Sequence, residues 1–480
     1  MRVRRLVAVA SMVLAAPPVA AERERGIGGR RSVREGTRWV RVEADGSRFE
    51  LEPRVITVRF ADEVERAAQD AVLAVLGGVE LRRAITGFVD VEVDAGRDVL
   101  EAVAAFAARP EIVSAEPNTI GAYLLVPDDP LYGSQWHLPK VMAPEAWDET
   151  AGDAVAVIAV LDSGTEFTHE DLGPGSDAHQ NVWLNPGEDA WADPDDPATG
   201  NGVDDDGNGF VDDWKGWDFG NGDNDSRGTF FHGTAVAGVA AAKTGNGIGV
   251  AGVAGGLDAP GARVLIAGVG DSAPLGSILD DAILYAAELD ADVIQLSLTV
   301  GQSAAIDAAL EMAYDVFGLT IICSSGNGGG AAVGYPSSDP HVIAVGSTGP
   351  SDQKSGFSQY GVGLELAAPG ESIWTLDLFD DYGPTSGTSF SSPLTSGVVA
   401  LMLAVEPTLS NLEIRQMLRD TAAKVGGYDY DWDPGMPGHS RELGYGRVDA
   451  QAAVLAAAAG TIFADGFESG DLGAWSEVSP

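Results

Sequence analysis

Short apolar segments that alternate with helical patterns make up most of the chain after residue 150. The strand-like segments are 155–161, 264–267, 293–298, 321–324 and 342–345, and the helical ones are 278–289 and 304–316. Continuous apolar runs of this length are typical of strands that are buried on both faces. Strands that alternate with helices form a parallel sheet with helices on both sides. The sequence therefore predicts an α/β domain built on a central parallel sheet.

Three residues with catalytic potential stand at the ends of predicted elements. Asp162 follows the strand at 155–161, at the edge of the sheet where α/β proteins bind ligands. His232 opens a helix of small residues, and Ser389 opens an apolar helix. A helix N-terminus offers free N–H groups and a positive dipole end, which suit a serine whose attack creates an oxyanion. A lone serine there is commonly an N-cap, but the order Asp, His, Ser is that of the subtilisin triad.

The chain from about residue 127 to 457 resembles the subtilisin family of serine endopeptidases. The motifs are Asp162-Ser163-Gly164, His232-Gly233-Thr234, Ser325-Gly326-Asn327-Gly328 and Gly387-Thr388-Ser389. The resemblance implies a three-layer αβα fold around the parallel sheet. It also implies that Asp162, His232 and Ser389 form the catalytic triad, with Asn327 in the oxyanion hole. His232 would take the Ser389 proton while Asp162 fixes the imidazole tautomer.

The same resemblance assigns a set of substrate-binding residues. These are Ser297, Leu298, Thr299, Ser324, Ser325, Gly326 and Gly334. The first three match the segment with which substrate pairs as an added strand. Gly334 matches the floor of the S1 pocket, and a glycine floor leaves room for a large apolar P1 side chain. Gly328 stands where some relatives carry an acid, which removes a reason to prefer basic P1 residues.

The first 21 residues have the pattern of a secretory signal. Arg2, Arg4 and Arg5 precede an apolar stretch at 6–16, and Val19-Ala20-Ala21 forms a small-x-small cleavage site. The apolar stretch is too short to span a bilayer comfortably. We therefore expect a signal peptide at 1–21 and a secreted, extracellular protein.

The segment between the signal and the α/β domain predicts a small α+β domain. Strand and helix patterns at 55–60, 63–76, 81–85, 88–93, 99–107 and 112–115 follow a βαββαβ order, the ferredoxin-like arrangement. It resembles the inhibitory propeptide of secreted subtilases. We expect a propeptide at 22–124, folded at about 54–118, then the catalytic domain at 125–457 and a short tail at 458–480. Tyr123, Leu124 and Leu125 are the expected P1 residues for self-processing.

A long acidic insertion, about 181–225, predicts a calcium site. Asp204, Asp206, Asn208 and Asp212 take positions one, three, five and nine of an EF-hand-like loop, and Phe210 would offer its carbonyl at position seven. Position twelve is Lys215 rather than glutamate, so the loop is not a full EF-hand. Without a cation, so many carboxylates would repel one another.

A second calcium site is implied by the family resemblance alone. Asp129 and Asp171 match its carboxylates, and Asn246 matches a ligand in the loop after the His232 helix. Ile248 and Val250 match ligands that bind through their carbonyls. We expect calcium as the cofactor of both sites.

The charge and the cysteine content limit the partners of the protein. The formal net charge is −43, from 72 acidic and 29 basic residues, which argues against nucleic acid and anionic membranes. Cys323 is the only cysteine, so packing and metal ions must hold the fold without an intramolecular disulfide. We expect a monomer without stable membrane insertion. Its partners would be protein and peptide substrates and its own propeptide, acting as inhibitor and folding aid.

Two other functions stay open on the sequence. A narrow-specificity processing protease or a transpeptidase would use the same fold and the same four catalytic positions. A non-catalytic binding module would also be compatible with the fold, although such proteins usually lose a triad member and this chain has all three.

Overall fold

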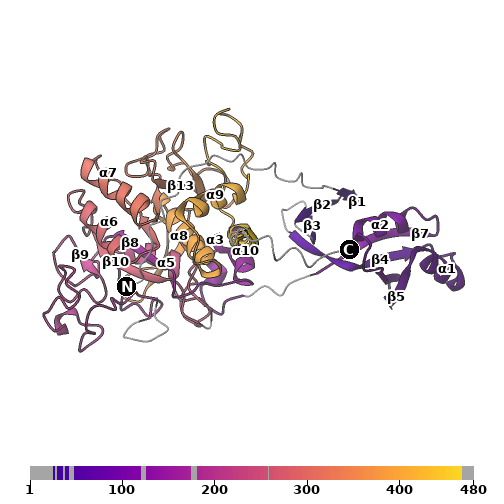
Figure 1. Ribbon diagram of the computed structural model, residues 1–480, viewed down its shortest axis with the longest axis horizontal. Helices are drawn as coiled ribbons and strands as arrows, with labels where there is room; N and C mark the ends of the chain where they lie inside the picture. The colour runs from indigo at the N-terminus through magenta and orange to yellow at the C-terminus, as the bar shows by residue number, and fades with distance from the viewer. Residues whose placement is uncertain are drawn as a thin grey trace. The chain divides into compact units, whose positions relative to one another are not determined.

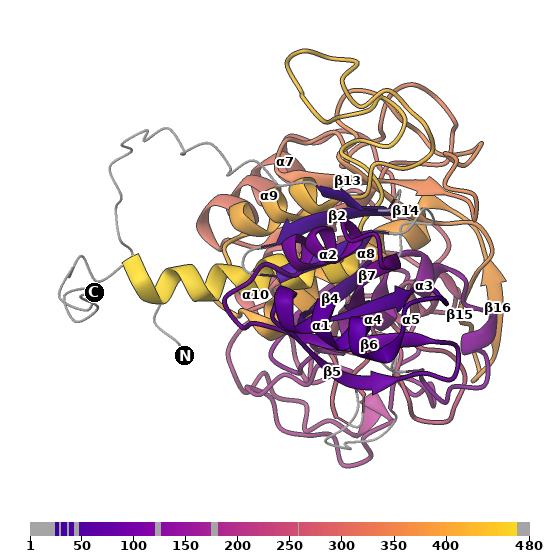
Figure 2. The same ribbon diagram turned by 90° about the vertical axis from the view of Figure 1, so that its right-hand side faces the viewer.

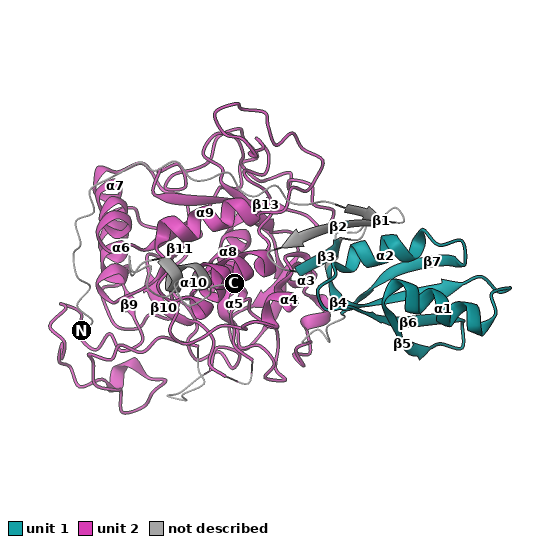
Figure 3. Ribbon diagram, turned by 45° about the vertical axis from the view of Figure 1, so that its right-hand side comes forward, with its two compact units in different colours: residues 1–123 teal, residues 124–480 magenta. Residues whose placement is uncertain are grey.

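The computed structural model divides into two compact units, residues 1–123 and 124–480 (Figure 3). It describes residues 25–27, 30–35, 38–42, 48–120, 126–173, 181–257 and 259–467. The predicted signal peptide, the processing segment Tyr123 to Leu125 and the end of the predicted tail lie outside these residues.

The first unit contains the predicted βαββαβ order. Its elements are β1 (Arg25–Ile27), β2 (Arg30–Glu35), β3 (Arg38–Val42), β4 (Arg48–Phe60), α1 (Arg66–Leu76), β5 (Gly78–Arg83), β6 (Phe88–Val93), α2 (Val99–Ala107) and β7 (Ile112–Thr119). The strands β7, β4, β6 and β5 lie side by side in that order and pair antiparallel. Strand β5 begins three residues earlier than expected, because Gly77 adopts a left-handed conformation that ends α1 and turns the chain directly into the strand.

One face of this sheet carries the core of the first unit. Ile56 and Val58 on β4 and Val89 and Val91 on β6 are fully buried, as expected for every second residue of a strand. They pack with buried residues of α1 and α2, among them Phe106, so that both helices cover the same face (Figure 2).

The second unit contains a seven-stranded parallel sheet. Its elements are η1 (Tyr132–Ser134), α3 (His137–Lys140), α4 (Ala143–Trp147), β8 (Val157–Asp162), η2 (Pro197–Thr199), β9 (Trp217–Asp218), α5 (His232–Ala241), β10 (Arg263–Gly268), α6 (Leu279–Glu288), β11 (Val293–Leu296), α7 (Ala304–Glu311), η3 (Met312–Val316), β12 (Thr320–Ser324), β13 (Val342–Thr348), β14 (Leu366–Pro369), β15 (Ile373–Leu376), β16 (Tyr382–Thr385), α8 (Thr388–Val405), α9 (Asn411–Thr421) and α10 (Ala450–Phe467). The sheet order is β14-β13-β12-β11-β8-β10-β9.

The two faces of this sheet bury alternate residues under different helices. On β8, Ile158 and Val160 belong to a core shared with α5, α8 and α10, while Ala159 and Leu161 belong to a core shared with α6 and α7 (Figure 1). This arrangement confirms the predicted three-layer αβα fold around a parallel sheet.

Strand β8 lies at the topological switch point of the sheet, where successive strands stop being added on one side and are added on the other. It pairs with β10 on one side and β11 on the other, and both pairings are parallel. Ligands of open α/β sheets bind outside the carboxyl ends of the strands at such a point. Asp162 is the last residue of β8, so the sheet topology alone places its carboxylate at the expected binding edge.

Two helical boundaries differ from the expected ones. The predicted helix at 304–316 is α7 followed by the π-helical turn η3. Helix α10 runs past residue 457, where the tail was expected to begin, to Phe467. Its alanine-rich sequence has the highest helix propensity, which accounts for the continuation.

Helix α8 is a core helix despite its composition. Among the described residues it is the one helix long and apolar enough to cross a membrane, but 89% of that stretch is buried inside the fold. Gly397 allows α8 to lie close to α5, because a Cβ at this position would be 3.0 Å from the carbonyl oxygen of Ala240.

Candidate active site

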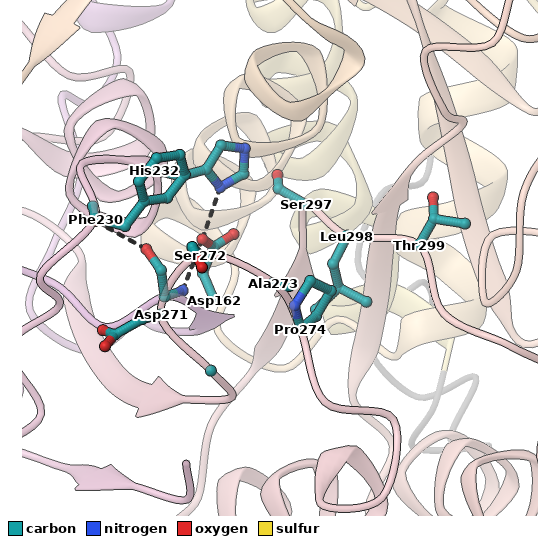
Figure 4. A pocket seen from close by; sticks show the side chains of 12 residues that line it. Asp162, Phe230, His232, Asp271, Ser272, Ala273, Pro274, Ser297, Leu298 and Thr299 are labelled. Atoms are coloured by element: carbon teal, nitrogen blue, oxygen red, sulfur yellow. Dashed lines mark hydrogen bonds and ion pairs between the residues drawn. The ribbon is translucent and has the colours of Figure 1, made fainter. Parts of the chain in front are cut away.

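Asp162 and His232 form a close pair at the carboxyl edge of the sheet. The Nδ1 atom of His232, the first residue of α5, lies 2.7 Å from Oδ1 of Asp162 (Figure 4). Asp162 is 5% exposed, and its Oδ1 also accepts the N–H of Ser163. A buried carboxylate at Nδ1 leaves Nε2 as the imidazole atom that can exchange protons with a substrate or a nucleophile.

The surroundings of His232 act on its pKa in opposite directions. Burial lowers the pKa, since it disfavours the charged ring, but the charge of Asp162 and its hydrogen bond raise it more. The net effect is a pKa above the ordinary value of 6.5. The arrangement therefore stabilises the imidazolium that forms when His232 accepts a proton.

Ser389 is the second residue of α8 and lies next to this pair. It is 7% exposed, and the ring of the following residue, Phe390, lies 5.7 Å from the His232 ring between centroids. The hydroxyl of Ser389 donates to the carbonyl oxygen of Ser297 at 3.4 Å. Within the described part of the chain no hydrogen bond joins it to His232. Catalytic hydrogen bonds are often long or absent without substrate, and a change of χ1 would redirect the hydroxyl.

A buried network of hydrogen bonds holds the start of α8 on the sheet, and the sequence analysis missed it. The side chain of Gln295 donates to the hydroxyls of Ser297 and Ser392, and it accepts from Ser396. Ser297 in turn donates to the Ser389 carbonyl oxygen at 2.7 Å. The sequence did contain a sign of this network: Gln295 is polar in an apolar strand, and Ser392 and Ser396 lie four residues apart on a helix.

Asn327 is held in place by the residue that precedes the serine. The backbone N–H and the hydroxyl of Thr388 both donate to Oδ1 of Asn327, each at 2.9 Å. The Thr388 hydroxyl also accepts the N–H of Gly326 at 3.2 Å. Because Oδ1 is occupied, the Nδ2 donor of Asn327 is left for another acceptor, and it lies beside Gly387. The role of Thr388 was not predicted.

The structure brings the predicted S1 segments together. The N–H of Gly334 donates to the Ser325 carbonyl oxygen at 2.9 Å, and a Cβ on Gly334 would lie 3.2 Å from the Thr299 side chain. Ser324 ends β12, and Gly326, two residues later, adopts a positive φ of 107°. Strand β11 ends at Leu296, two residues earlier than expected. Ser297 to Thr299 therefore follow the strand and lie at the edge of the sheet.

A hollow of about 250 Å³ adjoins the Asp162–His232 pair (Figure 4). Its lining residues are Asp162, Ser163, Phe230, His232, Gly270, Asp271, Ser272, Ala273, Pro274, Ser297, Leu298 and Thr299. Three of these were predicted to bind substrate. The 270–274 loop and Phe230 were not predicted, because neither carries a recognisable motif and the loop lies far from the triad in sequence.

The calcium ligands implied by the family resemblance converge around one loop. Asp129 accepts the N–H of Gly245 at 2.8 Å, and Asp171 accepts the side-chain amide of Asn246 at 2.9 Å. The N–H of Val250 also donates to Asp171, and the N–H of Ile248 donates to Asn246. Two buried carboxylates therefore share this loop, which is a donor set that suits calcium.

Burial dominates the titration of these two acids. It raises the pKa of Asp171 to about 8, against hydrogen bonds from Val250 and Asn246 and together with the charge of Asp129. Burial also raises the pKa of Asp129, while backbone N–H donors lower it. Both acids are thus costly to keep charged without a positive partner.

The predicted ligands of the acidic insertion make hydrogen bonds within the insertion, and their role as calcium ligands stays a prediction. Asp204 accepts three backbone N–H groups of its own loop, from residues 207 to 209, and Asp212 accepts the N–H of Gly202. Asn208 donates its amide to Asp206, and the ring of Phe210 packs against Tyr285, with 4.9 Å between centroids. Asp204 therefore holds the backbone of its own loop, whereas Oδ1 of Asp212 is buried without a hydrogen-bond partner.

The side chain at position twelve of the loop, Lys215, points into the protein. Lys215 is fully buried, 3.4 Å from Asp195 and 4.8 Å from the centre of the Phe167 ring. Burial lowers its pKa, and the charge of Asp195 raises it.

Among the described residues, the acids whose carboxylate oxygens lie within 4.8 Å of one another are Glu188, Asp206 and Asp213.

Comparisons with known proteins agree with this geometry. The model of the subtilase family matches residues 153–446, and that of the fervidolysin N-terminal prodomain matches residues 41–118. The halolysin-like extracellular serine protease Nep of Natrialba magadii is 37% identical over 345 residues, which are 72% of this chain and 56% of Nep. Halolysin of Haloferax mediterranei is 33% identical over 73% of this chain and 59% of its own length.

A shorter relative is matched over nearly its whole length. Thermitase of Thermoactinomyces vulgaris is 34% identical over 314 residues, 64% of this chain and 96% of thermitase. The chain spans less than two thirds of the two halolysin-type relatives. Since the family match covers more than half of the chain, the predicted resemblance is confirmed. The chain belongs to the subtilase family and carries a prodomain of the fervidolysin type.

Proposed function

We propose that this protein is a secreted serine endopeptidase that hydrolyses peptide bonds through Asp162, His232 and Ser389. The observation that carries the proposal is the 2.7 Å Asp162–His232 pair at the sheet edge where Ser389 opens α8. Two relatives, Nep and a thermophilic serine proteinase of Bacillus sp., are named as serine proteases or proteinases and support it. The name of Nep describes that relative as extracellular, which supports secretion of this protein.

The reaction would follow the general course of triad catalysis. His232 takes the Ser389 proton as Oγ bonds to the peptide carbonyl carbon, and it then passes that proton to the leaving amine as the C–N bond breaks. The Asn327 amide and the Ser389 N–H bind the oxyanion. Water then attacks the acyl carbon and gives a proton to His232, which returns it to Oγ of Ser389 as the ester bond breaks and the acid is released. Asp162 keeps the imidazole in the required tautomer throughout.

A covalent probe tests the nucleophile directly. A fluorophosphonate should label the protein once, and mass spectrometry of the digest should place the adduct on Ser389. Ser389→Ala should abolish both labelling and peptide hydrolysis without changing the melting temperature. Turnover by a folded Ser389→Ala protein, or labelling elsewhere, would refute the assignment. A non-catalytic binding module would not be labelled at all.

The P1 preference rests on the contact between Gly334 and Thr299. Because Gly334 adds no side chain to that wall, substrates with P1 Leu, Phe, Tyr or Met should have higher kcat/KM than those with Arg, Lys or Asp. A peptide library measures this preference. It also distinguishes broad digestion from a narrow-specificity processing protease or a transpeptidase.

Calcium is the proposed cofactor of the loop that contains Asp129 and Asp171. These residues would hold the ion with Asn246 and the carbonyl groups of Ile248 and Val250, and the ion would neutralise two buried carboxylates. Removal of calcium by a chelator should therefore lower the melting temperature of the Ser389→Ala protein. We also propose a monomer without stable membrane insertion, inhibited by its own propeptide before processing.

A further inference from the structure

The stretch of chain that follows Asn327 has almost no side chains of its own to hold it. Between Asn327 and Tyr335 the sequence is Gly-Gly-Gly-Ala-Ala-Val-Gly, and all of these residues are exposed or half-buried. Val333 is the only one with a side chain larger than a methyl group. Because glycine loses more backbone freedom on folding than any other residue, the conformation of residues 326–334, the glycine-rich segment, must depend on contacts from outside it.

Residues 357–360 supply such contacts through their backbone. The N–H of Gly329 donates to the Phe357 carbonyl oxygen at 2.7 Å. The N–H of Gln359 donates to the Gly326 carbonyl oxygen at 2.9 Å. The two segments therefore lie side by side, although they are far apart in sequence.

The side chain of Gln359 adds two hydrogen bonds that span the glycine-rich segment. Its Oε1 accepts the N–H of Gly328 at 3.3 Å, and its Nε2 donates to the carbonyl oxygen of Ala332. Among the described residues, no other side chain has a hydrogen bond to the backbone of residues 328–333. One carboxamide therefore joins two points of a stretch that has few contacts of its own.

The same carboxamide packs against the residues immediately before and after Asn327. Gly326 adopts a φ of 107°, and a Cβ there would lie 2.1 Å from Oε1 of Gln359. A Cβ on Gly328 would lie 3.4 Å from the same oxygen. The Gln359 side chain therefore contacts the backbone on both sides of Asn327.

Residues 357–360 are themselves fixed to the body of the second unit. The hydroxyl of Ser325 donates to the Gln359 carbonyl oxygen at 3.0 Å. Ser358 is fully buried, and its hydroxyl accepts the N–H of Ser347, on β13, at 2.9 Å. A side chain presented from a fixed backbone holds its partners more precisely than one on a free loop.

We propose that Gln359 is a positioning residue that keeps Asn327 in the orientation required for the oxyanion hole. Thr388 holds the Asn327 side chain through Oδ1, whereas Gln359 holds the backbone around it. An oxyanion donor is most effective when it already points at the developing charge. The inference rests on the proposed function, since Asn327 is the oxyanion donor of that reaction.

Steady-state kinetics of the processed enzyme test the effect on catalysis. Gln359→Met has a similar length and lacks both bonds, so it should lower kcat by about tenfold and change KM by less than about twofold. Gln359→Glu keeps an acceptor for the Gly328 N–H, and its kcat should stay within about threefold of the wild-type value. Gln353→Met is the matched control, because Gln353 bonds to Gly426 and Tyr428 instead, and its kcat should be unchanged.

A double-mutant cycle shows whether the effect passes through Asn327. In an Asn327→Ala background, Gln359→Met should lower kcat by less than about twofold. An equal loss in both backgrounds would overturn the inference, because Gln359 would then act independently of the oxyanion donor. A loss in the Gln353→Met control as large as that in Gln359→Met would overturn it too.

Hydrogen exchange follows the glycine-rich segment without relying on catalysis. In the full chain carrying Ser389→Ala, Gln359→Met should speed exchange of the amides of residues 328–330 by about fivefold or more, and Gln353→Met should not. Unchanged exchange would show that the segment does not depend on Gln359 and would overturn the inference. Gln359→Ala, which also lacks both bonds, gives the same comparison if Gln359→Met does not fold.

Failure of this inference can be told apart from failure of the proposed function. A wild-type protein that neither reacts with the fluorophosphonate nor hydrolyses peptides would refute the proposed function and this inference with it. A labelled and active wild-type protein whose Gln359→Met variant keeps the wild-type kcat would refute this inference alone.

Discussion

At the scale of single residues, the site depends on side chains that position other side chains. Asp162 orients His232 and raises the pKa of its imidazole. Thr388 orients Asn327 by donating twice to the same oxygen. Neither contact requires substrate, so both groups are held in place before the reaction. Such preorganised donors stabilise developing charge more than mobile ones do.

The pH dependence of activity follows from His232. The imidazole must be neutral to accept the Ser389 proton, and its pKa is raised above 6.5 by Asp162. Activity should therefore rise with pH through an apparent pKa above 6.5, and the acidic limb of a kcat/KM profile measures it. Asp162→Asn should move that limb to lower pH and reduce kcat by about 10⁴-fold, as in another serine protease triad. A limb that stays in place would contradict the assigned cause.

The role of Thr388 is testable by its effect on Asn327. Thr388→Val removes one of the two donors to Oδ1 and should lower kcat by about fivefold with little change in KM, since the lost bond contributes roughly 1 kcal/mol. Thr388→Ser should restore most of the rate. In an Asn327→Ala background, Thr388→Val should have almost no further effect. An equal loss in both backgrounds would show that Thr388 acts independently of the oxyanion hole.

At the scale of secondary-structure elements, the close packing of α5 and α8 sets the distance between His232 and Ser389. Each helix carries its proposed catalytic residue in its first turn, so a shift of one helix against the other separates the two groups. Gly397 lies at the contact, beside Ala240 and Val253. The buried hydrogen bonds of Gln295 hold α8 on β11 from the other side.

Gly397→Ala should destabilise this contact. The added Cβ would lie 2.6 Å from a Val253 carbon, and overpacking of this kind costs about 1–3 kcal/mol. This exceeds the gain in helix propensity of about 1 kcal/mol. Gly460→Ala on α10 is the matched control, because its Cβ would meet only Met417 at 3.5 Å. Urea unfolding in the Ser389→Ala background should show a loss for the first variant and none for the control.

At the scale of the whole molecule, a separately folded first unit precedes the catalytic unit. Its core is made of its own strands and helices, so it can fold as a domain. The first unit contains the match to a prodomain, and synthesis as an inactive precursor cleaved in the 123–126 segment stays a prediction. The cleavage point itself stays a prediction.

Maturation should depend on the catalytic serine of the same chain. Wild-type protein should be secreted with an N-terminus within residues 124–126, because the large apolar residues before it suit an open S1 pocket. The Ser389→Ala protein should accumulate with the propeptide attached. N-terminal sequencing decides between the two forms. Normal shedding of the propeptide by Ser389→Ala without added protease would contradict self-processing.

Much of the architecture followed from the sequence alone. The hydrophobic patterns of strands and helices are set by residues close together in sequence, so the parallel sheet and the βαββαβ order were both predictable. The triad motifs were recognisable for the same reason, since each is a short run of residues around Asp162, His232 or Ser389.

The tertiary structure decided what depends on contacts between distant segments. Spacing along the insertion favoured Asp204 and Asp212 as metal ligands, and that role stays a prediction; in the fold both also accept nearby backbone N–H groups. Glu188 and Asp213, which no motif marks, meet Asp206 only because the insertion folds back on itself and Tyr285 approaches from α6. Local spacing determines which residues are near in sequence, whereas a cation site requires oxygens that are near in space.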